Sequence, residues 1–266
     1  MTDIPIRFSQ ADFDEFARIS GDLNPIHVDA EFARATRFGG TVAHGMMLFA
    51  VTSAELARLE GPVNIATQEL MCTHPTFADR PYVLSLRKPS VGPVEATLQT
   101  DDGTTTMQSK SWLGDGAPST SGASGAETAQ RLDRLSLRDT ASSTRTFSPG
   151  DVDSLVSLVD DPDPRHRGPG ATVPPALVGG LISYLLGMQL PGPGTNWLKQ
   201  RYDFLSEVPP GSPVTGSVEI VRLRPEKQLV DLACRCEVDN DTVMTGRSLV
   251  YVGSLRSQIA PPWGRR

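Results

Sequence analysis

The chain has 266 residues, of which 38% are hydrophobic and 21% are charged, and its formal net charge is −6. This length allows one large domain or two smaller ones, and the composition excludes wholesale disorder. An acidic chain is also unlike nucleic-acid-binding proteins, which usually present a basic face.

The remaining global features point to the cytoplasm. The three cysteines, Cys72, Cys234 and Cys236, form an odd and sparse set that fits a reducing compartment better than a disulfide framework. The segment 1–5 has no basic start and no apolar signal core. No run approaches the roughly 18 apolar residues that span a bilayer. We therefore expect a soluble cytoplasmic protein that binds neither membrane nor nucleic acid.

The first third of the chain predicts three helices. Ser9 is a plausible N-cap with Asp12 three residues later, and Gly21 is a natural end for the helix that follows. Asp29 can cap a second, short helix that runs through Thr36. The third helix, His44–Leu59, is apolar on nearly all sides, which is typical of a buried helix.

Strand-like segments follow this helix. The candidates are Tyr82–Leu86, Val94–Leu98 and Thr106–Leu113, although their alternation of polar and apolar residues is weak. Residues 115–146 are rich in Gly, Ser, Ala and Thr, a composition that buries little surface and is typical of a flexible linker.

The segments on the two sides of this linker resemble each other. With Phe8 placed over Phe147, an offset of 139, the matches include Ser9 with Ser148, Asp12 with Asp151, Asp22 with Asp161, and His27 with His166. Thr41 and Val42 then match Thr172 and Val173 at an offset of 131, so the second copy is eight residues shorter. A repeat of this length indicates two similar domains rather than a solenoid. We expect repeats at 1–114 and 147–266, joined by the linker 115–146.

The second repeat has clearer strands than the first. A helix is expected at Ala176–Leu190, followed by alternating segments at Ser217–Leu223, Leu229–Cys234 and Ser248–Val252. A long buried helix followed by an antiparallel meander indicates an α+β fold in which a sheet wraps around the helix.

The residues with the clearest chemical meaning lie near the start of the chain. Asp22 and His27 are five positions apart in a loop that Pro25 stiffens, and Gly45 opens the apolar helix. An adjacent acid and base can take a proton from water and protonate a carbon on one face of a double bond. Backbone N–H groups at the start of a helix can stabilise negative charge on a thioester oxygen. These parts suit the addition or removal of water next to a thioester.

A family resemblance rests on the same segments. The stretch from Phe8 to Asp29, with Gly21-Asp22-Leu23-Asn24-Pro25-Ile26-His27 at its centre, and then Ala43-His44-Gly45-Met46, resembles the MaoC-like (R)-specific enoyl-CoA hydratase and dehydratase family. In the second repeat, Leu190–Thr195, Tyr202–Phe204, Pro209–Gly211 and Gly246–Ser248 are similar to the strand half of that family.

The resemblance implies a hotdog fold, in the two-repeat form called a double hotdog. It implies that Asp22 and His27 are the catalytic pair and that the N–H of Gly45 binds the thioester oxygen. Asn24, His44 and Ser53 would lie beside the substrate, although His44 could be a structural core histidine and Ser53 an ordinary helix residue. No cofactor and no metal site are expected.

The second repeat keeps the spacing of the acid and the base in Asp161 and His166. It has Pro174-Pro175-Ala176-Leu177 where the first repeat has Ala43-His44-Gly45-Met46, and proline has no N–H to offer an oxygen. We expect a relic site that helps to form the substrate channel, with a second working site as the alternative.

Three functions stay open at this point. The leading hypothesis is a lyase that adds water to, or removes it from, an α,β-unsaturated thioester of CoA or of an acyl carrier protein. The same site could instead add an amine or hydrolyse the thioester, for which Glu55 on the central helix is available. The third possibility is a non-catalytic acyl-binding subunit. A double hotdog contains its own pseudo-dimer, so both a monomer and a homodimer are compatible with the sequence.

Overall fold

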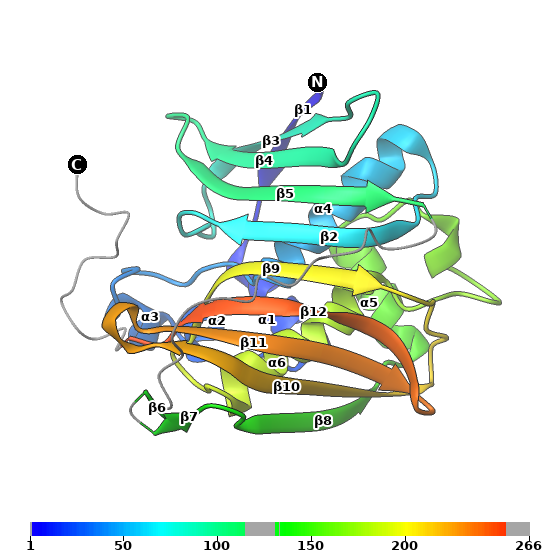
Figure 1. The fold of residues 1–266 in the computed structure, drawn as a ribbon. Helices are drawn as coiled ribbons and strands as arrows, with labels where there is room; N and C mark the ends of the chain where they lie inside the picture. Colours follow the sequence, from blue (N-terminus) through cyan, green and yellow to red (C-terminus); the bar gives the residue numbers. More distant parts are fainter. Residues whose placement is uncertain (1, 115–130, 133, 254–266) are drawn as a thin grey trace.

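A single ten-stranded antiparallel sheet forms the frame of the molecule. The computed structural model describes residues 2–114, 131–132 and 134–253. The strand order is β1-β3-β4-β5-β2-β9-β12-β11-β10-β8, so all strands of the N-terminal half lie on one side and all strands of the C-terminal half on the other (Figure 1). The two halves meet where β2 pairs with β9, with Leu70 opposite Gln200.

The strands of the two halves correspond one to one. The first half contains β1 (Thr2–Arg7), β2 (Ile65–Cys72), β3 (Pro81–Arg87), β4 (Val94–Thr100) and β5 (Thr105–Leu113). The second contains β8 (Thr140–Thr146), β9 (Asn196–Phe204), β10 (Pro213–Arg224), β11 (Leu229–Val238) and β12 (Asp241–Tyr251). We call Thr2–Leu113 repeat one and Thr140–Tyr251 repeat two. A small hairpin, β6 (Arg131–Leu132) and β7 (Leu135–Ser136), precedes repeat two.

The helices follow the same division. Repeat one has α1 (Gln10–Ser20), α2 (Pro25–Val28), α3 (Ala30–Arg34) and α4 (Gly45–Glu60). Repeat two has α5 (Pro149–Leu158), η1 (Pro164–His166), α6 (Pro175–Tyr184) and the π-helical turn η2 (Leu185–Gln189), and a short turn η3 (Pro225–Lys227) joins β10 to β11.

The local signals at the helix ends are confirmed. Ser9 and Asp12 form a reciprocal capping box, and Gly21 ends α1 in the left-handed conformation with φ of 81°. Ser148 and Asp151 form the same box at α5. Asp29 caps α3 by accepting from two backbone N–H groups.

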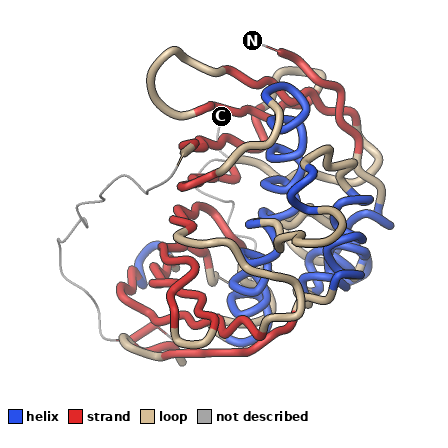
Figure 2. Tube along the Cα trace, turned by 90° about the vertical axis from the view of Figure 1, so that its right-hand side faces the viewer, coloured by secondary structure: helices blue, strands red, loops and turns tan. Residues whose placement is uncertain are grey.

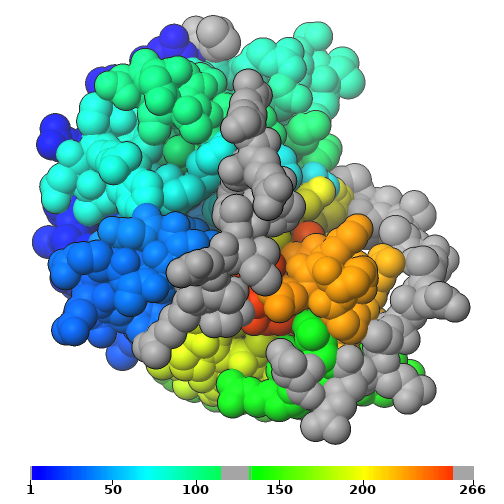
Figure 3. All heavy atoms as spheres, turned by 90° about the vertical axis from the view of Figure 1, so that its left-hand side faces the viewer, coloured from blue at the N-terminus to red at the C-terminus, as the bar shows by residue number. Residues whose placement is uncertain are grey.

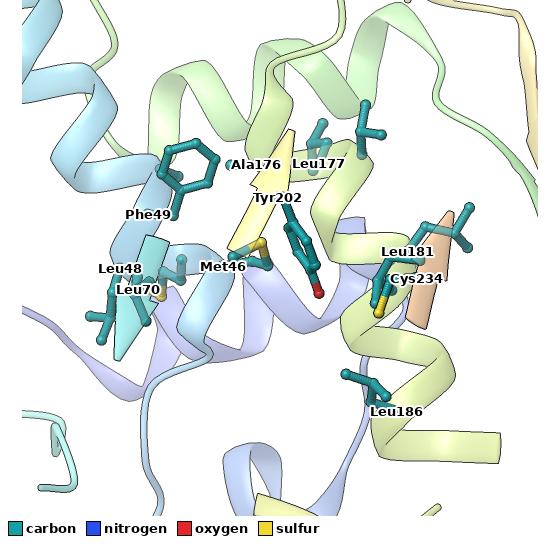
Figure 4. Close-up of a cluster of buried hydrophobic side chains, with 14 of the residues drawn as sticks. Met46, Leu48, Phe49, Leu70, Ala176, Leu177, Leu181, Leu186, Tyr202 and Cys234 are labelled. Carbon is teal, nitrogen blue, oxygen red and sulfur yellow. The ribbon is translucent and has the colours of Figure 1, made fainter. Parts of the chain in front are cut away.

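The sheet curves around the helices, which gather on one of its faces (Figure 2). Among them, α4 and α6 pack against each other. Their close approach depends on Gly179, because a Cβ there would lie 2.4 Å from Sδ of Met46. Side chains of both helices, among them Met46, Phe49, Leu177 and Leu181, gather around Tyr202 of β9 (Figure 4). One core therefore joins the two repeats into the expected α+β double hotdog architecture.

The predicted linker is wrong for part of its length. Residues 115–130 and 133 lie outside the described residues, but Thr140–Thr146 form strand β8 at the edge of the main sheet, paired with β10. An edge strand with alternating exposed Ser and Thr buries little surface, so its composition imitated a linker. β8 is the counterpart of β1, which the sequence patterns also missed. Apart from β8, the predicted domain boundaries at residues 114 and 147 stay predictions.

The central helices also differ from their predicted alignment. The N-caps of α4 and α6 are His44 and Pro174, an offset of 130 rather than 131. Gly45 therefore corresponds to Pro175, and Ser53 corresponds to Ser183. The helical turns at the end of α6 are π-helical, whereas α4 stays α-helical to Glu60. Both differences affect the site described next.

In the described part of the chain, the helices are too short or too polar for any of them to cross a bilayer.

Candidate active site

Asp22 lies directly after the left-handed end of α1 and is almost fully buried. One carboxylate oxygen accepts from the N–H of Asn24 at 3.2 Å, and the other accepts from the hydroxyl of Ser183 at 2.5 Å. Burial raises the pKa of this carboxyl, while the charge of His27 and these two hydrogen bonds act in the opposite direction. A carboxyl held in this way can take up or release a proton nearer to neutral pH than an exposed aspartate does.

His27 sits in the short helix α2 and is fixed through one ring nitrogen. Its Nδ1 lies 2.6 Å from the carbonyl oxygen of Val42, and a carbonyl can only accept, so Nδ1 carries the hydrogen. In the neutral ring, Nε2 then has a free lone pair. Burial lowers the pKa of His27, although the nearby Asp22 carboxylate favours the charged form. The arrangement gives a neutral imidazole with one basic nitrogen.

His44 contacts both members of this pair. Its ring stacks on the ring of His27 with centroids 3.7 Å apart, and its Nε2 donates to the backbone oxygen of Asp22 at 2.9 Å. The side chain is fully buried, and both burial and the neighbouring His27 hold its pKa well below the ordinary value. His44 does not line the cavity described below, so its position fits the structural alternative rather than direct substrate contact.

Asn24 joins the loop of repeat one to repeat two. Its side-chain Nδ2 donates to the carbonyl oxygen of Thr195 at 3.1 Å, and its Oδ1 accepts from the N–H of Gly194 at 3.3 Å. This two-way bond ties the Asp22–His27 loop to the segment that enters β9. Figure 3 shows the corresponding contact on the surface, where the blue segment of α2 and α3 borders the yellow segment of repeat two.

Gly45 is the first residue of α4. The helical hydrogen bonds begin with the N–H groups of Met47 and Leu48, which donate to the carbonyl of His44, so the N–H groups of Gly45 and Met46 make no bond inside the helix. A Cβ at Gly45 would lie 3.4 Å from the ring of Trp197, which closes this end of the helix. The glycine therefore leaves space at a helix end that attracts negative charge.

These groups open on one cavity, which we call the first cavity. It has a volume of about 60 Å³, counted as the space open to the centre of a water molecule, and Asp22, Asn24, His27 and Gly45 all line it. The segment 72–76 after β2 forms another wall. Repeat two contributes Ser183, Leu186, Gly187 and residues 195–197. The Asp–His pair of repeat one therefore faces a cavity that both repeats build.

The structure corrects the expected place of Ser53. Ser53 donates to the carbonyl of Phe49 in its own helix and lines a different cavity, together with Asp161, His166 and Pro175. We call this the second cavity. Because α4 and α6 pack against each other, the ninth residue of each helix lies beside the acidic residue of the other repeat. Ser183, and not Ser53, is therefore the serine of this helix position that lies at the candidate active site, where it bonds Asp22.

Two residues of repeat two escaped the sequence analysis. An offset of 130 would have pointed to Ser183, but the match of Thr41 and Val42 with Thr172 and Val173 favoured 131. Gly187 lies in the π-helical turn, where a Cβ would approach Oδ1 of Asp22 to 2.5 Å. A π-helical turn has no sequence signal as clear as a cap, although such turns often mark functional sites.

The Asp161–His166 pair has a different geometry from its counterpart. Nδ1 of His166 lies 2.6 Å from Oδ2 of Asp161, so the acid and the base bind each other. Oδ1 of Asp161 accepts from the N–H of Asp163. Pro175 is the first residue of α6 and has no N–H for an oxygen. The second cavity thus contains the acid and the base but not the donor that Gly45 provides.

The geometry around Asp22 and His27 would allow a metal ion to bind. Among the described residues, Asp22, His27 and His44 form the group whose ligand atoms lie within 4.8 Å of one another. Each imidazole already donates from one ring nitrogen to a backbone carbonyl, so each could offer only the other. The expectation of a metal-free site stays a prediction.

Comparison with known proteins gives the family. The model described as "MaoC like domain" matches residues 1–78, which include the whole Asp22–His27 loop and the start of α4. A 3-hydroxybutyryl-CoA dehydratase of Methylorubrum extorquens is 35% identical over 117 residues, covering 41% of this chain and 74% of that protein. The chain belongs to the MaoC-like family. An (R)-specific enoyl-CoA hydratase of Rhodospirillum rubrum is 31% identical over 121 residues, covering 42% of this MaoC-like chain and 84% of the relative.

Solved structures match most of this MaoC-like chain in fold. A structure titled "MaoC-like dehydratase" has a TM-score of 0.74 at 13% identity and covers 95% of this chain and 97% of its own. A Mycobacterium tuberculosis protein whose title states a double hotdog fold has a TM-score of 0.69 at 13% identity, with 93% of each chain covered. At these identities the likeness concerns the fold alone, and it agrees with the two-repeat sheet described above.

Proposed function

We propose that this protein is a hydratase or dehydratase that adds water to, or removes it from, an α,β-unsaturated acyl-CoA. The observation that carries the proposal is the convergence of Asp22, His27 and the start of α4 on one cavity. An acid, a base and a free backbone N–H are the three groups that this reaction needs. The names of the two relatives, a dehydratase and a hydratase of CoA thioesters, agree with it.

In hydration, water attacks the β-carbon while a base takes its proton. The lone pair of Nε2 on His27 suits this base, because Nδ1 is committed to Val42. The raised pKa of Asp22 suits an acid that delivers a proton to the α-carbon. The pair therefore holds one proton before and after the reaction, because His27 takes a proton from water and Asp22 gives its own to the α-carbon. Both transfers take place on the same face of the double bond. Dehydration is the same sequence in reverse.

Negative charge moves to the thioester oxygen as the new C–O bond forms. The N–H of Gly45 at the start of α4 is the proposed donor to that oxygen, and the helix dipole acts in the same direction. A donor of this kind typically contributes about 3–4 kcal/mol to the transition state. Pro175 cannot serve in this way, so we propose that the second cavity does not catalyse the reaction and that Asp161 and His166 remain as a relic pair.

No observation favours the alternative of thioester hydrolysis through Glu55. Glu55 forms an ion pair with Arg58 at 3.3 Å and does not line the first cavity. Addition of an amine would use the same acid and base, so only the products separate it from hydration. A non-catalytic role is disfavoured because Nε2 of His27 keeps a free lone pair and because both Asp22 and His27 line the first cavity.

The test is a comparison of matched variants in the two repeats. Crotonyl-CoA is incubated with the protein, and the loss of enoyl absorbance is followed together with the product mass. We expect Asp22→Asn and His27→Gln each to lower kcat by about 10²–10⁴, the range for loss of acid–base catalysis. Asp161→Asn and His166→Gln should change it by less than about three-fold. Equal losses in both repeats, or turnover that survives the first two changes, would contradict the proposal.

A further inference from the structure

Two polar groups in the first cavity have no hydrogen-bond partner among the described residues. They are the hydroxyl of Thr76 and the indole N–H of Trp197, and both atoms are buried. Buried polar groups in native proteins are almost always paired, so each such group requires an explanation. Leaving one unpaired is costly, because the group has lost its hydrogen bonds to water. A bound substrate that pairs them is one explanation.

Both groups lie next to the segment that holds the reacting thioester in the proposed function. The carbonyl of Thr76 accepts from the N–H of Ala43 at 2.8 Å, and the ring of Trp197 packs against Gly45. They come from opposite repeats, Thr76 from the loop after β2 and Trp197 from β9. Each of the two walls therefore contacts the segment at the start of α4.

Thr76 lies at the buried end of the segment 72–76, which forms one wall of the first cavity. Within the segment 72–76, His74 is exposed and marks the mouth of the cavity, whereas Thr76 is 4% exposed. Ile26, Val42 and Leu48 supply apolar surface to the same cavity. The inner, largely apolar part of such a cavity suits the acyl chain, while the CoA portion must leave through the mouth.

The two groups also define what they can bind. The indole N–H only donates, and the threonine hydroxyl donates one hydrogen, so the common partner is a hydrogen-bond acceptor. Among the described residues that line this cavity there is no lysine and no arginine. A carboxylate would be buried there without a counter-charge, which is costly. A neutral oxygen fits the site better.

We propose that the preferred substrate is an enoyl thioester whose acyl chain carries a neutral oxygen, as an ether, hydroxyl or ketone, bound by Thr76 with Trp197 as a second donor. This inference rests on the proposed function for its reaction but not for its binding step. It predicts that the site discriminates against a plain alkyl chain of equal length, because such a chain leaves both donors unpaired.

The experiment pairs an isosteric variant with isosteric substrates. Thr76→Val replaces the hydroxyl by a methyl group. Hex-2-enoyl-CoA is compared with 4-methoxybut-2-enoyl-CoA and 5-hydroxypent-2-enoyl-CoA, which carry oxygen at two different chain positions. We expect the wild type to prefer at least one oxygenated substrate in kcat/KM. Thr76→Val should lower that preference by about five- to ten-fold, as expected for one hydrogen bond.

Two outcomes overturn the inference. In the first, neither oxygenated substrate is preferred. In the second, Thr76→Val lowers kcat/KM equally for all three substrates, which assigns the hydroxyl to the thioester or the pantetheine arm.

A binding measurement separates this inference from the proposed function. Hexanoyl-CoA, 4-methoxybutanoyl-CoA and 5-hydroxypentanoyl-CoA are saturated and cannot be hydrated, and their affinities are measured by calorimetry for both proteins. A preference for an oxygenated ligand that Thr76→Val removes supports the acyl-oxygen site even if no enoyl thioester is turned over. Equal affinities of the three ligands for the wild type would count against it.

Discussion

The hydrogen bond between Ser183 and Asp22 gives the sharpest test of how the two repeats cooperate. It is 2.5 Å long, it joins residues of different repeats, and the residues that form it are buried. Ser183→Ala removes the donor without adding volume. Asp22 would keep the N–H of Asn24 as a partner but lose its hydrogen bond to a side-chain hydroxyl.

The size of the effect follows from the negative charge that the Asp22 carboxylate gains as it gives up its proton. Hydrogen bonds to charged groups contribute about 1.5–3 kcal/mol, and each 1.36 kcal/mol corresponds to a ten-fold change in rate. We therefore expect Ser183→Ala to lower kcat/KM on crotonyl-CoA by about ten- to hundred-fold at neutral pH. Ser53→Ala, at the same position of α4, is the matched control and should change the rate by less than about two-fold.

The pH profile identifies the cause. The bond to Ser183 lowers the pKa of Asp22, so its loss must raise that pKa further. The pH dependence of kcat/KM should move to higher pH in Ser183→Ala and stay in place in Ser53→Ala. Equal rates for the two variants would refute the reasoning, and so would a loss in Ser183→Ala that is the same at every pH. A thermal melt of each variant checks that the fold is retained.

Three further changes address other parts of the site. Gly187→Ala should lower activity more than ten-fold, because its Cβ would lie 2.5 Å from Oδ1 of Asp22; Gly150→Ala on α5, where the nearest atom is 3.6 Å away, should leave the rate unchanged. His44→Phe should weaken the fall in stability at acid pH. The buried neutral His44 has a lowered pKa, so the unfolded state binds its proton first as the pH drops below about 6.5. Urea unfolding between pH 7 and 5 should show a shallower slope in the variant, by at most about 1.4 kcal/mol per pH unit. Asn24→Asp replaces the donor to Thr195 by a carboxylate oxygen and should lower both the melting temperature and kcat/KM, and an unchanged melting temperature would show that the link between the repeats is weak.

The assembly of the site explains why both repeats are needed. The Asp22–His27 loop and the start of α4 come from repeat one, whereas the bond to the Asp22 carboxylate and the wall at Trp197 come from repeat two. The segments that resemble the MaoC-like family in the sequence are the helical part of repeat one and the strand part of repeat two. These two parts meet at the first cavity.

The sequence by itself determined the local features. Capping boxes at Ser9 and Ser148 and the left-handed end at Gly21 depend on residues within a few positions, so their patterns predicted α1 and α5 well. The same holds for the spacing of Asp22 and His27 and for the buried helix α4. The repeat itself also emerged from the sequence, because the offset of 139 covers two complete helices.

The tertiary structure alone decided which distant residues meet. Strands β1, β2, β8 and β9 obtain their hydrogen bonds from partners far along the chain, and their composition gave little sign of it. The pairing of Asp22 with Ser183 rather than Ser53 follows from the packing of α4 against α6, which no local pattern specifies. The same physical reason applies to the second repeat: Asp161 and His166 keep the spacing of the first pair, but only their packed surroundings let them bind each other instead of a substrate.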